Sequence, residues 1–215
     1  MTDRNLIFRA NMVRALLKGR KTQTRRVVKP RKHFSLFSGQ WSDSAVLLKG
    51  NQSWRDEEIR YRVGDRIWVR ESWSGDYVFR DTPPKSRNSF VADGHPYLRE
   101  TIWYWADGNP ENWDYEKPRP SIHMPRWASR LTLIVTDVRV QRLQDISEED
   151  ARAEGALLPW SGSPGTACDD TRTACSEFRA LWNILHGPDA WHTNPWVTAI
   201  TFTVHHGNID QMRAA

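Results

Sequence analysis

The order of the strand-like runs is the feature that most constrains the fold of this chain. Residues with β-branched and aromatic side chains cluster at 22–28, 67–71, 101–105, 131–140 and 196–204, and such runs are typical of strands. Short helix-like segments and long polar stretches separate them, with no repeating strand–helix unit and no glycine-rich phosphate turn. The pattern predicts an α+β fold with a small closed sheet rather than a doubly wound sheet.

Three short helices are predicted between these runs from apolar residues at helical spacing. They cover residues 12–17, 148–154 and 178–185. A glycine that can adopt the left-handed conformation follows each of them, namely Gly19, Gly155 and Gly187. Ser147 with Asp150 three residues later resembles a capping box at the start of the second helix.

The length of 215 residues suits one domain with a core of its own. We therefore expect a single domain over residues 1–215 with insertions at about 31–62 and 74–120. The first of these segments is polar, which indicates a loop or an insertion, and its secondary structure is not predicted. The second is rich in glycine, proline and aspartate but carries many aromatic rings, which predicts a long loop packed by its own aromatic side chains.

Cysteine and histidine usage argues against metal or disulfide chemistry. The two cysteines, Cys168 and Cys175, have no second pair that would complete a disulfide framework or a zinc site. The histidines show no metal-binding spacing, so we predict neither a metal nor a cofactor. No run approaches the roughly 20 apolar residues of a membrane helix, and no apolar segment follows the first charges. We predict a cytoplasmic protein without a membrane partner.

The charge distribution predicts an anionic partner. The net charge is +5, and no acidic residue occurs between Asp3 and Asp43, where Arg and Lys recur. Such a stretch is typical of phosphate binding, so we expect a nucleoside or a nucleic acid as partner, RNA rather than DNA. The alternative is a basic face exposed to solvent.

The basic segment 19–26 contains the strongest candidate for chemistry. Lys21 stands among Arg20, Arg25 and Arg26, and like charges lower the pKa of a lysine until its neutral form can act as a base. Thr24 lies three residues later, which faces Lys21 on a helical turn but points oppositely in a regular strand. Joint action of the two residues therefore needs a bend between them.

Several segments closely resemble ASCH-domain proteins of the PUA-like superfamily, especially the long phage or prophage members. The resemblance spans nearly the whole chain, and its most specific part is the block GRKTQTRR. The segments are MVRALLKGRKTQTRR at 12–26, VGDRIWVRE at 63–71, LQDISEEDA at 143–151 and SIHMPRWA at 121–128. The resemblance implies a PUA-like small mixed β-barrel with short helices covering its openings, here with aromatic-rich loop insertions, and a cleft suited to a base or nucleotide.

The resemblance also implies an activity. Some small ASCH proteins are amidohydrolases that cleave N4-acylated cytosine nucleosides such as N4-acetylcytidine with a lysine, a threonine and a glutamate. Carried over by position, these are Lys21 as base, Thr24 as nucleophile or water-positioning hydroxyl, and Glu154 as proton shuttle to the leaving amine. From its spacing alone, Glu154 equally fits an exposed residue near Arg152.

Aromatic and charged residues elsewhere complete the candidate site. Tryptophans on predicted loops are expected to line a cleft, whereas Trp68, Trp182 and Trp196 on predicted core elements are expected to pack. The residues expected to bind substrate are Arg20, Arg26, Arg70, Glu71, Trp73, Trp103 and Trp105. For Arg70 and Glu71, pairing on a strand is the alternative.

Two other functions compete with hydrolysis of the N4-acyl amide. In a non-catalytic RNA or DNA module, or a modified-base reader, the basic run would bind phosphates and aromatic rings would stack on bases. A ribonuclease would use Lys21 with Tyr61 or Ser72. The chain is longer than the small ASCH enzymes through its two insertions, which bears on its substrate and on the activity itself.

Overall fold

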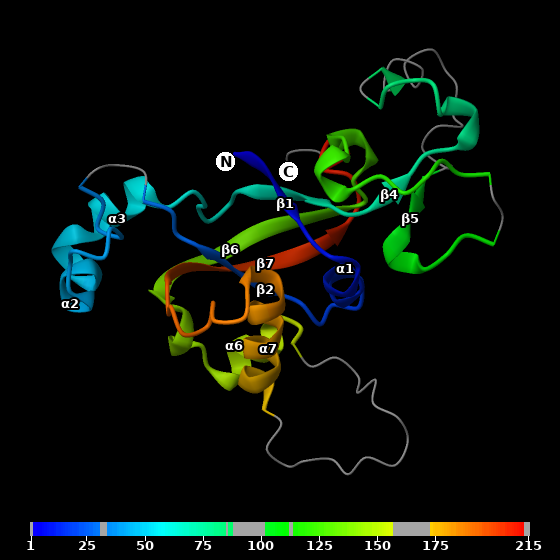
Figure 1. The fold of residues 1–215 in the computed structure, drawn as a ribbon. Helices are drawn as coiled ribbons and strands as arrows, with labels where there is room; N and C mark the ends of the chain where they lie inside the picture. Colours follow the sequence, from blue (N-terminus) through cyan, green and yellow to red (C-terminus); the bar gives the residue numbers. More distant parts are fainter. Residues whose placement is uncertain are drawn as a thin grey trace, which may run out of the picture. The chain divides into compact units, whose positions relative to one another are not determined.

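The computed structural model describes residues 2–30, 34–84, 86–87, 102–111, 114–156 and 173–212. Within them the fold is α+β, as predicted, with short helices and a five-stranded mixed sheet in the order β1-β3-β6-β7-β2 (Figure 1). The pairings found among these residues do not join the sheet into a ring. None of the helices in the described ranges is long and apolar enough to cross a membrane.

The chain divides into two compact units, which are described in turn. Unit 1 comprises residues 1–19, 64–134 and 203–215, and unit 2 comprises residues 20–63 and 135–202. The long strands β6 and β7 contribute residues to both.

Unit 1 is built on strands β1 (Asp3–Ile7), β3 (Arg66–Arg70) and the first residues of β6 (Leu131–Arg142). β1 pairs parallel with β3, and β3 pairs antiparallel with β6, with Ile67 opposite Leu133. Both of these side chains are fully buried, and as directly opposed residues they lie on the same face of the sheet. The strands near 67–71 and 131–140 are confirmed, whereas β1 was not predicted.

A helix and a small second sheet complete unit 1. α1 (Ala10–Leu17) confirms the first predicted helix, and Gly19 after it has a φ of 67°, as expected for a helix end. β4 (Trp73–Ser74), at the start of the second insertion, pairs antiparallel with β5 (Trp103–Tyr104) within it. Single-turn 3-10 helices occur at Tyr77–Phe79, Trp105–Asp107, Ser121–His123 and Arg126–Ala128.

Unit 2 contains strand β2 (Gln23–Val27), which pairs antiparallel with β7 (Trp196–His206). Both strands were predicted. The register places Thr24 opposite Ile200, and the part of β7 that pairs with β2 is buried almost throughout. β2 is the last strand in the order of the five-stranded sheet, and its first three residues are buried whereas Val27 at its end is exposed.

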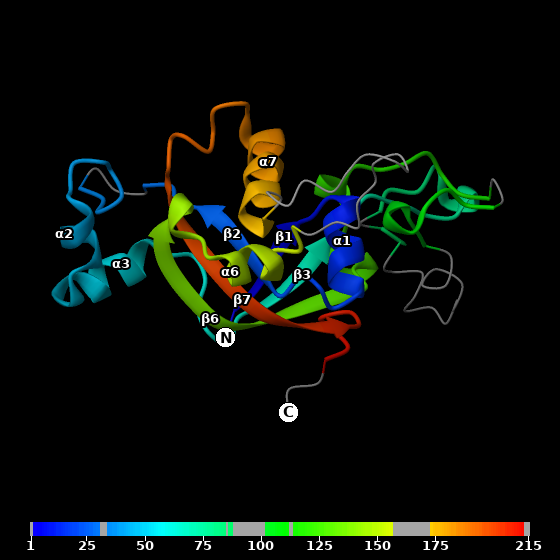
Figure 2. The same ribbon diagram turned by 90° about the horizontal axis from the view of Figure 1, so that it is seen from below.

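Helices α6 (Glu148–Ala153) and α7 (Ala174–His186) lie side by side next to β2 and β7 (Figure 2). The predicted cap of α6 is confirmed, because the Ser147 hydroxyl accepts a hydrogen bond from Asp150 N. The Glu148 carboxylate accepts hydrogen bonds from the first two amides of α7 at 2.9 and 3.1 Å. Hydrogen bonds lower the pKa of Glu148 to about 2, and those from Cys175 have the largest effect. The two bonds to the amides also tie the two helices together.

The described part of the first insertion contains helices, which the sequence did not predict. It forms α2 (Asp43–Leu47), a 3-10 turn at Lys49–Asn51 and α3 (Gln52–Glu58), and the two tryptophan rings at 41 and 54 meet edge to face at 5.5 Å. The Ser42 hydroxyl caps α2. The sequence lacks long apolar periodicity here because both helices are short and mostly exposed. A further 3-10 turn, Leu143–Asp145, follows β6.

Candidate functional site

A buried ion pair between Lys21 and Glu154 forms the centre of the candidate site. Lys21 Nζ donates a hydrogen bond of 2.7 Å to Glu154 Oε2, although the two residues are 133 positions apart in the chain. The side chains are 1% and 5% exposed. The alternative of an exposed Glu154 beside Arg152 is therefore wrong, and the structure brings these two predicted site residues together in unit 2.

Main-chain contacts hold the segment around Lys21 against the end of α6. Thr22 N donates a hydrogen bond of 2.8 Å to Ala153 O, and Thr22 O accepts one of 2.9 Å from Phe202 N on β7. Glu154 is the residue that directly follows α6. The strand β7 and the end of α6 thus fix where the lysine and the glutamate meet.

The Lys21 ammonium is fully coordinated by acceptors. Besides the carboxylate, Nζ donates to Gln23 O at 2.8 Å and to Glu154 O at 2.9 Å. An ammonium has three protons, and each of them has an acceptor here. The arrangement stabilises the protonated lysine in the resting structure and leaves proton exchange with Glu154 as the shortest route to a neutral amine.

The electrostatics of Lys21 differ from the prediction in their cause. The pKa of Lys21 is lowered, first because burial disfavours the charged form, while the charge and hydrogen bond of Glu154 raise it. Arg26 and Arg25 lower it further, but by less. The expected direction is therefore correct, and burial rather than the cluster of like charges is its main cause.

A second ion pair extends the site along α6. Arg25, whose side chain is fully buried, donates to Glu154 Oε1 at 3.2 Å through Nη1 and to Asp150 Oδ2 at 2.7 Å through Nη2. Asp150 also accepts hydrogen bonds from Gln23 Nε2 at 3.2 Å and from Arg139 Nη2 at 3.0 Å. Arg25 therefore bridges two carboxylates that lie about one helical turn apart.

These additional residues carried a recognisable signal in the sequence. Gln23 and Arg25 are two residues apart in a strand and so lie on the same face of β2. Asp150 and Glu154 are four residues apart, the spacing that puts two side chains on one side of a helix. Asp150 was assigned only to the helix cap, and Arg25 only to the basic cluster. Each set of side chains could have been placed on one face, but the meeting of the two faces requires the fold.

Thr24 and Arg26 occupy the other face of β2. By strand alternation Thr24 points away from the face of Gln23 and Arg25, and it is buried. β2 begins only at Gln23, so Lys21 precedes the strand and does not follow its alternation. Burial lowers the pKa of Arg26, and the charges of Glu154 and Tyr61 oppose this effect. Arg20 is half-buried at the start of unit 2.

The other predicted substrate-binding residues belong to unit 1, where two of them are buried. Glu71 holds Arg130 through two hydrogen bonds of 2.9 and 3.0 Å, and burial raises the pKa of Glu71. Glu71 is therefore in a charge pair with Arg130, not with Arg70 as the alternative expected. Trp73 is fully buried against Met124 and Ala128, so it packs in this structure.

The three remaining candidates of unit 1 are half-buried and make local contacts. Arg70 Nε donates to Ser121 O at 3.1 Å. Trp103 Nε1 donates to Gly108 O at 2.9 Å, and Trp105 Nε1 donates to Ser74 Oγ at 2.8 Å. Their indole nitrogens thus help to hold the β4–β5 region together.

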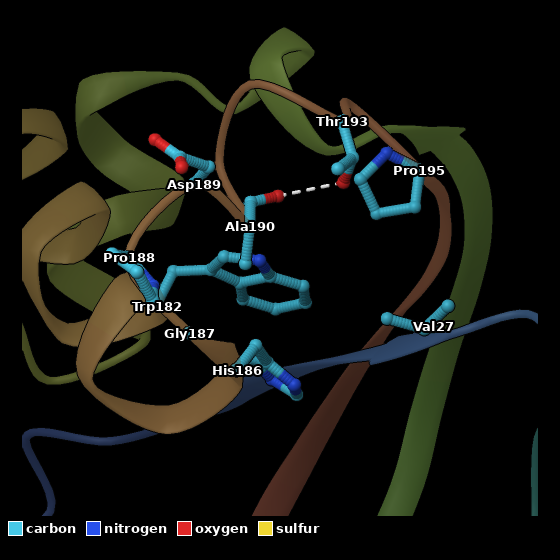
Figure 3. A pocket seen from close by; sticks show the side chains of 9 residues that line it. All are labelled: Val27, Trp182, His186, Gly187, Pro188, Asp189, Ala190, Thr193 and Pro195. Carbon is cyan, nitrogen blue, oxygen red and sulfur yellow. Dashed lines mark hydrogen bonds between the residues drawn. The ribbon is translucent and has the colours of Figure 1, made fainter.

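A pocket of about 480 Å³ lies at the far end of β2 from Lys21 (Figure 3). Val27, at the end of the strand, and Pro188 and Pro195 belong to its lining, and the Trp182 indole lies across it beside His186, with ring centroids 4.2 Å apart. A five-residue strand spans about 16 Å, so this pocket is separate from the ion pair. Trp182 is 3% exposed, which confirms it as a packing residue.

Metal binding finds no support in the part of the chain that is described. No group of three or more histidine, cysteine, aspartate or glutamate side chains there is arranged to hold a metal ion. The acidic groups of the site, Glu154 and Asp150, are engaged by lysine and arginine instead.

Comparison with known proteins gives no family assignment. No family model matches the chain, and no curated protein matches it. The solved structure of the protein EF3133 from Enterococcus faecalis V583, described under the family-model name DUF984, covers 100% of this chain and 86% of its own at 10% identity, with a TM-score of 0.40. This likeness is too low to support an argument about fold or function.

Proposed function

We propose that this chain hydrolyses the N4-acyl amide of an acylated cytosine nucleoside or base, with N4-acetylcytidine as the reference substrate. The proposal extends to the family and the fold that the sequence resemblance implies, an ASCH-domain protein with a PUA-like barrel. The observation that carries it is the contact of Lys21 with Glu154, since the resemblance requires these distant residues to meet and they lie 2.7 Å apart.

The buried pair supports acid–base chemistry because it can pass a proton directly. Transfer from Lys21 Nζ to Glu154 Oε2 gives a neutral amine and a carboxylic acid, and burial favours this neutral form of the pair. The amine then takes the proton of the attacking Thr24 hydroxyl or of a water. The protonated Glu154 side chain gives its proton to N4 as the carbon–nitrogen bond breaks and cytidine leaves. Where Thr24 is the nucleophile, water then hydrolyses the acyl ester on Thr24 and releases the acyl group as a carboxylic acid.

The pairing also weighs against the binding-module alternative. Lys21 and Arg25 are buried and paired with carboxylates, so two cations of the basic segment are not presented to phosphates. A groove that tracks a nucleic acid backbone needs exposed cations. The basic segment is therefore better suited to building a site than to holding a polymer.

The experiment is a hydrolysis assay with purified protein and N4-acetylcytidine, in which released cytidine is separated and quantified. Thr24→Val keeps the shape of the side chain and removes the hydroxyl, Glu154→Gln removes the acid, and Arg152→Gln is a control on the exposed side of α6. We expect losses of about 100-fold or more for the first two variants and wild-type rates for the control. Equal cytidine release by all four proteins would refute this site.

A further inference from the structure

The Arg25 guanidinium links the central ion pair to a second acidic residue. Its Nη1 donates to Glu154 Oε1 at 3.2 Å and to Gln23 Oε1 at 2.6 Å, and its Nη2 donates to Asp150 Oδ2 at 2.7 Å. Arg25 Nε is buried and has no hydrogen-bond partner in the described ranges. The grip of Arg25 on α6 thus depends on its two terminal nitrogens.

We propose that Arg25, anchored by Asp150, is a positioning residue of the amide-cleaving site that orients the Glu154 carboxylate toward Lys21 and determines which of the two groups holds their shared proton. This inference rests on the proposed function. It assigns no contact between Arg25 and the substrate.

The orienting role follows from the geometry of the carboxylate. Glu154 lies beyond the last turn of α6, so the helix fixes its backbone but not its side-chain torsions. Arg25 occupies Oε1 and thereby directs Oε2 to Lys21 Nζ. Because the guanidinium is rigid and planar, fixing one of its nitrogens on Asp150 also fixes the other.

The role in proton distribution follows from the charges around Lys21. The groups that act on it include Glu154, which directly follows α6, and the two arginines Arg25 and Arg26 of β2. Asp150 compensates Arg25 from behind, and Arg139 contacts Asp150 from the surface. After burial and Glu154, the positive charges of Arg26 and then Arg25 also lower the pKa of Lys21, so removing Arg25 raises that pKa. Removing the negative charge of Asp150 acts in the opposite sense.

The test compares Arg25→Gln with Asp150→Asn in two assays. The pH dependence of kcat/KM for N4-acetylcytidine reports the base, and the ¹³Cε resonance of Lys21 reports its titration in the intact protein without substrate. We expect both to move up by about one pH unit in Arg25→Gln and down in Asp150→Asn. kcat is expected to fall by about 10-fold or more in both variants, with little change in KM.

Two further variants separate positioning from general destabilisation. Arg152→Gln removes one positive charge, as Arg25→Gln does, from an exposed position on α6, the helix that carries Asp150, and it should leave the pH profile and the titration unchanged. Arg25→Lys keeps the charge but loses the fork, so it should lower kcat without moving the pH profile. Thermal unfolding checks that each variant is folded. If Arg25→Gln does not fold, the loss of kcat in Arg25→Lys tests the positioning role, and the titration in Asp150→Asn tests the role in proton distribution.

The outcomes distinguish this inference from the proposed function. A Lys21 titration that does not move, or moves in the same direction in Arg25→Gln and Asp150→Asn, overturns the role of Arg25 whatever the activity. A titration that moves in opposite directions supports it. Absence of N4-acetylcytidine turnover by wild-type protein with such a titration refutes the proposed function alone.

Discussion

Replacing Lys21 by methionine tests how much the buried pair contributes to stability. Methionine keeps the length of the side chain and removes the ammonium, which leaves two main-chain carbonyls, Gln23 O and Glu154 O, without their donor. Each unpaired buried acceptor costs about 1–3 kcal/mol. Arg25 still compensates the Glu154 charge, and methionine avoids the desolvation of an ammonium.

We therefore expect Lys21→Met to lower the free energy of unfolding by about 3 kcal/mol, at the low end of the range for breaking a buried pair. Urea unfolding followed by tryptophan fluorescence measures this. The exposed Lys18 provides the control, since Lys18→Met should change the free energy by less than about 0.5 kcal/mol.

A double-mutant cycle identifies the pair as the source of the effect. Glu154→Gln alone leaves Lys21 buried without a counter-charge, whereas Lys21→Met/Glu154→Gln removes both charges. The double variant should lose less stability than the sum of the single variants, by at least about 1 kcal/mol. A loss below about 1 kcal/mol in Lys21→Met, or strict additivity, would contradict the reasoning.

Three further predictions concern other parts of the molecule. Burial raises the pKa of Asp150, but hydrogen bonds from Arg139 and Gln23 and the charges of Arg25 and Arg139 outweigh this effect and leave the pKa below 3.8. The contribution of the Asp150 carboxylate to the stability of the fold is therefore present above that pH and is lost as the pH falls. Acid titration should destabilise the wild-type protein more than Asp150→Asn. Trp73→Ala should cost about 3–5 kcal/mol in urea unfolding, and Trp73→Phe much less because the buried Nε1 has no partner in the described ranges. Glu148→Gln should speed hydrogen exchange at the first amides of α7, measured by NMR, and unchanged exchange would argue against the cap.

The elements with strong local signals were predictable from the sequence. α1 and α6 have glycines after their ends, and β2, β6 and β7 are rich in β-branched residues, so local preference and tertiary structure agree. β1 was missed because the five residues from Asp3 to Ile7 alternate weakly, and pairing with β3 makes them a strand. The helices of the first insertion are too short for a clear period.

The contact of Lys21 with Glu154 was indicated by the sequence, but the electrostatics around it were not. The block around Lys21 indicates a special environment, yet neighbouring cations alone do not reveal that burial dominates. The role of Arg25 depends on the packing of α6 against β2, which brings Asp150 and Glu154 to one guanidinium. Trp73 was assigned to a cleft because it stands next to a predicted loop, whereas the β4–β5 pairing places it in a core.

The most direct measurement of the central claim is an NMR time course of N4-acetylcytidine with catalytic amounts of the wild-type protein. The account predicts that free acetate and cytidine accumulate in equal amounts, and that both cease to form when the ammonium at position 21 is replaced by the methionine side chain in a variant that remains folded. An unchanged substrate spectrum with wild-type protein, or equal rates of acetate release by the two proteins, would contradict it.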